Sequence, residues 1–165
     1  MLINYDQRNS DFLRAVRRAA RRSLENGSRL VARDLVREAL ALPAPAWYLS
    51  TDYAWRRLKL LRAGKLLPAP GSLRRLMLEE LDGHLSEASR RLPTADPYAL
   101  LDDILSGNGP LPSRFFISEE YALRLFTGSA RRKVPDGCRR ALPMPDARHR
   151  RRRPASRTSS SSVTI

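Results

Sequence analysis

Arginine side chains supply most of the chemistry that can be recognised in this sequence. The 165 residues include 31 lysine or arginine side chains and 17 acidic ones, which gives a formal charge of +14 at neutral pH. This balance favours phosphate backbones or an anionic membrane surface as partners. The arginines stand out in two groups, which are Arg14, Arg17, Arg18 and Arg21 near the start and Arg148, Arg150, Arg151, Arg152 and Arg153 near the end.

The first group has the spacing of one face of a helix. Apolar residues such as Phe12, Val16 and Ala19 fall on the other side of the same helix, because residues three and four apart share a face. An arginine face of this kind can follow a nucleic-acid backbone, or it can be the solvated side of an amphipathic helix. A high-GC genome also enriches arginine over lysine, and the sequence leaves these interpretations open.

The second group lies in a C-terminal segment with almost nothing to bury. Residues 134–165 combine prolines, a run of four arginines and a serine tract, a composition typical of disorder. Residues 131–165 hold 11 basic and two acidic side chains, a difference of +9. We therefore predict a helical domain over residues 1–133 and a disordered basic tail over 134–165. Such a tail would bind nucleic acid by counterion release and without sequence specificity.

Other site chemistry is sparse. Cys138 is the only cysteine, and His84 and His149 are the only histidines, so neither a disulfide nor a zinc site with several cysteines can form within one chain. Glu80 lies one turn before His84, and we expect an exposed helical ion pair there. The sequence has no glycine-rich phosphate loop and no nucleophile motif. We expect a protein that is not an enzyme and has no cofactor or metal.

Local signals predict about six helices and a mainly α fold. Capping residues, glycines and prolines place their ends, and Asn9-Ser10, Ser28, Ser50, Ser72, Asp96 and Ser118 are the expected N-terminal caps. The fourth helix has the clearest apolar stripe, which consists of Leu73, Met77, Leu81, Leu85, Ala88 and Leu92. The predicted helices span residues 11–25, 29–41, 51–63, 73–92, 97–107 and 119–131.

An internal repeat links two of these helices. A shift of 68 positions aligns WYLSTDYAWR, which begins at Trp47, with FFISEEYALR, which begins at Phe115, and four of the ten positions are identical. The repeated unit covers residues 44–62 and 112–130, and it consists of a proline turn, an extended aromatic triplet and a capped helix. We expect the aromatic residues to be core residues rather than base-stacking platforms. The matched triplets suggest the hypothesis that they pair as a short β ribbon.

The repeated motif also carries a resemblance. Proline, an aromatic residue, Tyr or Phe, Leu or Ile, Ser, an acid and Tyr-Ala follow a helix like DLVREAL. This pattern resembles a group of small uncharacterised proteins of Bacteroidetes genomes. The resemblance covers about residues 30–62, with an echo near the sixth helix, and it implies no catalytic or binding residues.

These observations lead to one functional hypothesis and one alternative. We expect a cytoplasmic protein that associates non-specifically with DNA or RNA through its tail and first helix. The alternative is a module for binding a protein partner or a second copy of the chain, in which the tail only adds solubility. Contact with an anionic membrane is a weaker expectation, since the same charges would serve it.

Overall fold

The fold of the protein is mainly α-helical, as predicted. A computed structural model describes residues 3–132, and no strand forms among them. The predicted tail, with Arg148, Arg150, Arg151, Arg152 and Arg153, lies outside the described residues. The elements are α1 (Tyr5–Glu25), α2 (Ala32–Ala41), α3 (Thr51–Arg62), α4 (Leu73–Arg91), α5 (Pro97–Asp103), a π-helical turn η1 (Ile104–Asn108) and α6 (Glu119–Arg132).

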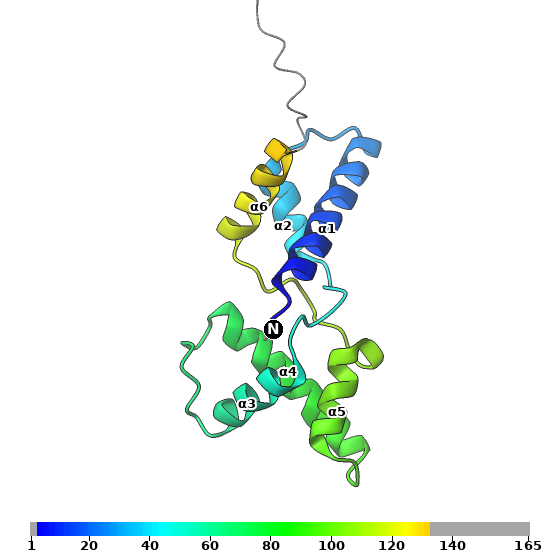
Figure 1. The fold of residues 1–165 in the computed structure, drawn as a ribbon. Coiled ribbons are helices and arrows are strands. Elements are labelled where there is room, and N and C mark those ends of the chain that lie inside the picture. Colours follow the sequence, from blue (N-terminus) through cyan, green and yellow to red (C-terminus); the bar gives the residue numbers. More distant parts are fainter. Residues whose placement is uncertain (1–2, 133–165) are drawn as a thin grey trace, which may run out of the picture. The chain divides into compact units, whose positions relative to one another are not determined.

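The helices pack as two bundles of three, and the chain crosses between the bundles twice (Figure 1). In the first bundle α1, α2 and α6 contact one another, and in the second α3, α4 and α5 do so. The first linker (residues 42–50) leads from α2 to α3, and the second linker (residues 109–118) leads from η1 back to α6. Each linker carries one copy of the repeated aromatic triplet.

The two triplets direct their side chains alternately into the two bundles. Trp47 is buried in the core of the second bundle, while Tyr48 packs against the core of the first. The second linker shows the opposite order, because Phe115 is buried in the first bundle and Phe116 packs against the second. The expectation of core residues is confirmed for Trp47 and Phe115, which are each only 2% exposed, whereas Tyr48 and Phe116 are half-buried.

Each buried aromatic ring also contacts the longest helix of its own bundle edge-on. The ring of Phe115 lies 5.6 Å from that of Phe12 in α1, and the two planes are 77° apart. Trp47 lies 5.8 Å from the ring of His84 in α4, at 71°. Edge-to-face pairs of this kind add to the free energy gained by burial alone.

The hypothesis of a β ribbon between the triplets is wrong for the described residues. Leu49 instead forms an isolated antiparallel bridge with Ile3. Tyr48 has a φ of 59°, which interrupts an extended strand. The indole of Trp47 donates to the carbonyl of Pro110 over 2.9 Å, and the amide of Phe115 donates to the carbonyl of Leu40 over 3.3 Å. The linkers therefore make their hydrogen bonds outside a ribbon.

Two predicted helix starts need correction. The first helix begins at Tyr5 rather than at residue 11, because the side chain of Asn4 accepts from the amide of Gln7. The second begins at Ala32 without a side-chain cap. Ser28 is not its cap because its amide closes the end of α1 by donating to Ser23, next to Gly27 with a φ of 67°, as in a Schellman motif.

The other starts agree with the sequence, but the stripe on α4 is shifted. Ser50, Ser72, Asp96 and Ser118 each accept from the amide three residues later, which confirms them as caps. On α4 the buried residues are Leu78, Leu81 and Leu85. Leu78 is outside the predicted stripe, whereas Leu92, which was predicted in it, is 55% exposed. The buried face of α4 lies toward α3 and α5, with which the helix packs.

We predict opposite effects for two glycine-to-alanine substitutions. A Cβ at Gly109, directly after η1, would lie 3.0 Å from the Cα of Ile104, so Gly109→Ala should destabilise the fold by about 1 to 3 kcal/mol. Gly83 in α4 has open space around it, and Gly83→Ala should stabilise the fold by about 1 kcal/mol. Urea unfolding checks both changes, and a neutral Gly109→Ala would contradict the tight packing at this position.

Candidate functional site

The structure places all four predicted arginines of the first helix on its exposed face. Arg14, Arg17, Arg18 and Arg21 are exposed. The buried residues of α1, which are Phe12, Ala15, Val16 and Ala19, face the core of the first bundle. We call these four arginines the α1 arginine face.

Acidic side chains near this face form ion pairs, mostly with arginines outside it. Arg14 pairs with Asp11 over 3.2 Å and keeps 67% of its side chain exposed. Glu38 pairs with Arg22, and Glu119 of α6 takes up two arginines of α2, Arg33 and Arg37. Within the described part of the chain, no ion pair involves the three remaining arginines of the face, which are Arg17, Arg18 and Arg21.

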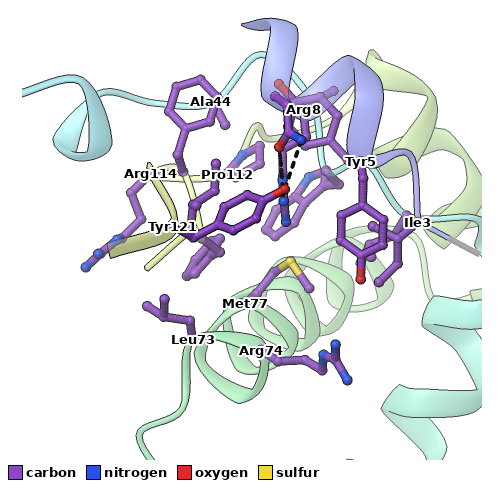
Figure 2. Close-up of a pocket in the computed structure, with 18 of the residues that line it drawn as sticks. Ile3, Tyr5, Arg8, Ala44, Leu73, Arg74, Met77, Pro112, Arg114 and Tyr121 are labelled. Carbon is purple, nitrogen blue, oxygen red and sulfur yellow. Dashed lines mark hydrogen bonds between the residues drawn. The ribbon is translucent and has the colours of Figure 1, made fainter. Parts of the chain in front are cut away.

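The structure also contains a cavity of about 730 Å³ between the bundles (Figure 2). The sequence did not reveal this second feature. Its wall is formed by the N-terminal turns of α1 and α4, by both linkers and by the start of α6. We call it the linker pocket. Its volume lies within the range of small-molecule sites.

Arg8 is the central cation of the linker pocket. Its guanidinium lies over two tyrosine rings, 4.7 Å from the centre of Tyr5 and 5.6 Å from that of Tyr121. The guanidinium also donates to the side chain of Asn9, whose amide donates to the hydroxyl of Tyr121 over 3.1 Å. These contacts hold the guanidinium of Arg8 close to Tyr121 at the start of α6 (Figure 2).

The charge lining the linker pocket is predominantly positive. Among residues 3–132, four arginines contribute to its wall, and Asp6 is the single acid that does so. The four are Arg8, Arg74, Arg114 and Arg124. Sequence reasoning missed them because they are dispersed over the chain. The position of Arg114 directly before the second aromatic triplet was the one signal available.

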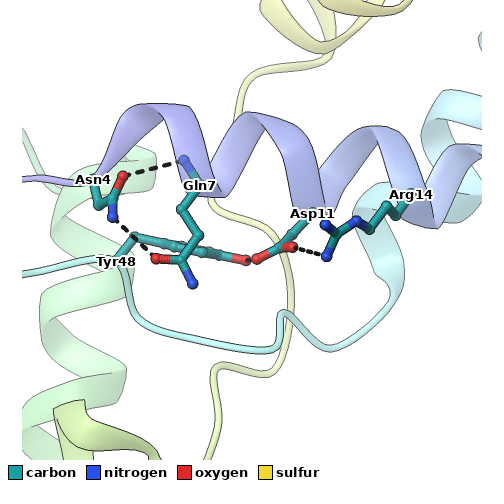
Figure 3. Close-up of polar contacts among 5 residues, drawn as sticks. All are labelled: Asn4, Gln7, Asp11, Arg14 and Tyr48. Atoms are coloured by element: carbon teal, nitrogen blue, oxygen red, sulfur yellow. Dashed lines mark hydrogen bonds and ion pairs between the residues drawn. The ribbon is translucent and has the colours of Figure 1, made fainter.

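Tyr48 connects the first linker to α1 at the edge of the linker pocket (Figure 3). Its hydroxyl donates to Asp11 over 3.0 Å, and its carbonyl accepts from the amide of Asn4 over 2.9 Å. Because Asp11 also pairs with Arg14, this contact joins the pocket wall to the α1 arginine face. Burial, and then the hydrogen bond to Asp11, raise the pKa of Tyr48 above its ordinary value.

The described residues form no group of side chains that could bind a metal ion. Among residues 3–132, no three histidine, cysteine or acidic side chains are placed to hold a metal ion. The expected pair of Glu80 and His84 spans 3.9 Å and is partly buried rather than exposed. Glu80 instead accepts from the amide and hydroxyl of Ser113, each over 2.6 Å. This carboxylate therefore attaches the second linker to α4.

We predict that Tyr48→Phe destabilises the fold by about 1 to 2 kcal/mol, because it removes a hydrogen bond to a carboxylate that is only 13% exposed. Tyr98→Phe is the matched control, since Tyr98 donates to the exposed Asp52, and its effect should be smaller. If both substitutions lower the free energy of unfolding equally in urea, the larger contribution predicted for the hydrogen bond of Tyr48 is contradicted.

The same hydrogen bond predicts a dependence on pH. The raised pKa of Tyr48 means that the unfolded chain loses this proton first, from its ordinary pKa of 10.0 upward. The stability contributed by Tyr48 is therefore complete below about pH 10 and is lost as the pH rises further. Tyr48→Phe should lose less stability above this pH than the unchanged protein.

The comparisons with known proteins add no family. No protein-family model, no curated protein and no solved structure matches this chain. The resemblance to the Bacteroidetes group stays a prediction. The roles considered for the α1 arginine face and the linker pocket therefore rest on geometry and charge.

Proposed function

We propose that the protein is not an enzyme and associates non-specifically with DNA or RNA through the α1 arginine face and the basic tail. The observation that carries the proposal is the exposure of Arg14, Arg17, Arg18 and Arg21 along one helix. Side chains at this spacing can reach successive phosphates of a backbone that runs along the helix. A reduced, cytoplasmic setting fits the presence of a single cysteine.

The distribution of charge supports the first bundle as the binding side. Residues 3–41, which form α1 and α2, contain nine arginines and five acidic side chains. Residues 51–108, which form the second bundle, contain nine basic and eight acidic side chains. The positive excess of the helical part therefore lies mainly on the bundle that carries the α1 arginine face. Long-range attraction would guide a polyanion to this side.

The basic tail would extend the same interaction. Residues 134–165 hold eight basic and two acidic side chains, a difference of +6, and they follow α6 in the chain, which belongs to the first bundle. Each phosphate neutralised by an arginine releases condensed counterions, and the binding constant therefore falls steeply with salt. None of the proposed interactions reads base edges, and we expect little preference for sequence.

One observation favours the alternative of a protein partner or a homodimer. Leu24, Leu30 and Val31 are 60%, 43% and 43% exposed, and all three lie at the connection between α1 and α2. Neighbouring exposed apolar side chains are typical of interaction surfaces. No helix among the described residues is long and apolar enough to cross a bilayer.

The proposal predicts that Arg17→Gln/Arg18→Gln/Arg21→Gln weakens binding to single-stranded and duplex DNA and lowers its salt dependence. For each phosphate that is no longer neutralised, the slope of log K against log salt should fall by about 0.7 to 0.9. Fluorescence anisotropy across about 50 to 200 mM salt measures both quantities. Deletion of residues 134–165 should have a further effect of the same kind.

The matched control is Arg56→Gln/Arg90→Gln/Arg91→Gln, which removes equal charge from exposed positions of the second bundle. It should weaken binding less than the change on α1. If the two triple variants behave alike, the α1 arginine face has no special role. If the full chain has no detectable affinity at low salt, the proposed function is wrong.

A test of the alternative uses light scattering after size exclusion. A protein that is monomeric and binds DNA in a salt-dependent way supports the main proposal. A stable dimer that Leu24→Asn/Leu30→Asn converts into monomers supports the alternative instead, because both substitutions reduce the exposed apolar surface at one site.

A further inference from the structure

We propose that the linker pocket binds a single nucleotide, with the base over the aromatic and apolar wall and the phosphate toward the arginines. The ligand is either a free mononucleotide or one unpaired nucleotide of a strand, since both offer the same ring and phosphate. This inference goes beyond the proposed function and does not rest on it. The α1 arginine face can bind duplex backbones whether or not the pocket is occupied.

The wall of the linker pocket offers surfaces for a flat ring. Tyr5 and Tyr121 are 42% and 38% exposed, and both line the cavity. Phe116 and Met77 add half-buried apolar surface from the second linker and α4. The guanidinium of Arg8 lies 4.7 Å from the ring centre of Tyr5 and 5.6 Å from that of Tyr121, so both rings border the positive charge of the pocket. Bases stack on such rings with little dependence on their identity.

The rim supplies the charge that a phosphate needs. Arg74 and Arg114 are exposed at the wall, and among the described residues no ion pair involves either of them. Arg124 has only a loose pair, 3.8 Å from Glu120, in which both side chains are largely exposed. Asp6 is the only opposing charge that the described residues place in the wall. Arginine forms paired hydrogen bonds with phosphate oxygens. The rim therefore favours a phosphate over a group that offers only one weak hydrogen-bond acceptor.

The combination of rings and cations selects the ligand class. A simple phosphate would leave the apolar wall unused, and a nucleoside would leave the arginines without a partner. A fatty-acid anion would match the charge and the apolar surface but would not stack on Tyr5 and Tyr121. A nucleotide uses both features of the linker pocket at once.

Calorimetric titration of the full chain tests this selection with four ligands: 5′-AMP, adenosine, inorganic phosphate and decanoate. We expect 5′-AMP to bind with 1:1 stoichiometry and each of the others to bind about tenfold more weakly or worse. Equal binding of decanoate would overturn the assignment of a ring. Equal binding of inorganic phosphate, or no binding of 5′-AMP, would overturn the nucleotide site.

Substitutions at the rim locate the ligand. Arg74→Gln/Arg114→Gln should weaken 5′-AMP binding about tenfold, whereas Arg56→Gln/Arg90→Gln removes the same charge outside the pocket and should leave it nearly unchanged. Ala46→Leu, which places a larger side chain in the pocket wall, should also weaken binding without changing the net charge. Circular dichroism and unfolding curves confirm that these variants fold. If the rim and control variants bind equally well, the ligand lies elsewhere.

A short single-stranded oligonucleotide distinguishes the two sources of the nucleotide. If a strand is the source, excess oligonucleotide displaces 5′-AMP, and Arg74→Gln/Arg114→Gln weakens both ligands. If the free nucleotide is the source, the oligonucleotide does not compete. Arg17→Gln/Arg18→Gln/Arg21→Gln should leave 5′-AMP binding intact in either case, which separates a failure of the pocket from a failure of the α1 arginine face.

Discussion

The double crossing of the chain between two helical bundles is the constraint on which the rest of the structure depends. Each linker has to bury side chains on both of its sides, and the alternating triplets at Trp47 and Phe115 do this for opposite bundles. The bond from Trp47 to Pro110 and the bond from Phe115 to Leu40 hold the linkers in place. Side chains of each linker enter the cores of both bundles, and both linkers contribute to the wall of the linker pocket.

The same packing determines where the arginines point. Phe12 packs against Phe115, which fixes the rotation of α1 about its own axis. With its apolar stripe in the core, the helix presents Arg17 and Arg21 to solvent. Its first turns place Arg8 between Tyr5 and Tyr121. One helix orientation thus accounts for the placement of both candidate sites.

Most features that depend on neighbouring residues were predictable, whereas features that depend on distant residues were not. Ser50, Ser72, Asp96 and Ser118 cap the predicted helices because capping is a local interaction. The first helix start was wrong because Asn4 offered an earlier cap, and Arg8 and Asn9 contact Tyr121, more than a hundred positions away. The arginine face followed from spacing alone. The linker pocket did not, since no local pattern unites Arg8, Arg74 and Arg114.

A map of backbone amide shifts by NMR, recorded while a single-stranded oligonucleotide is added to the full chain, tests the role of α1. Binding through the α1 arginine face predicts that the largest shifts lie along α1 from Arg14 to Arg21. It predicts small shifts in α3 and on the solvent side of α5. If the shifts concentrate in the second bundle and leave α1 unchanged, the α1 arginine face is not the binding surface.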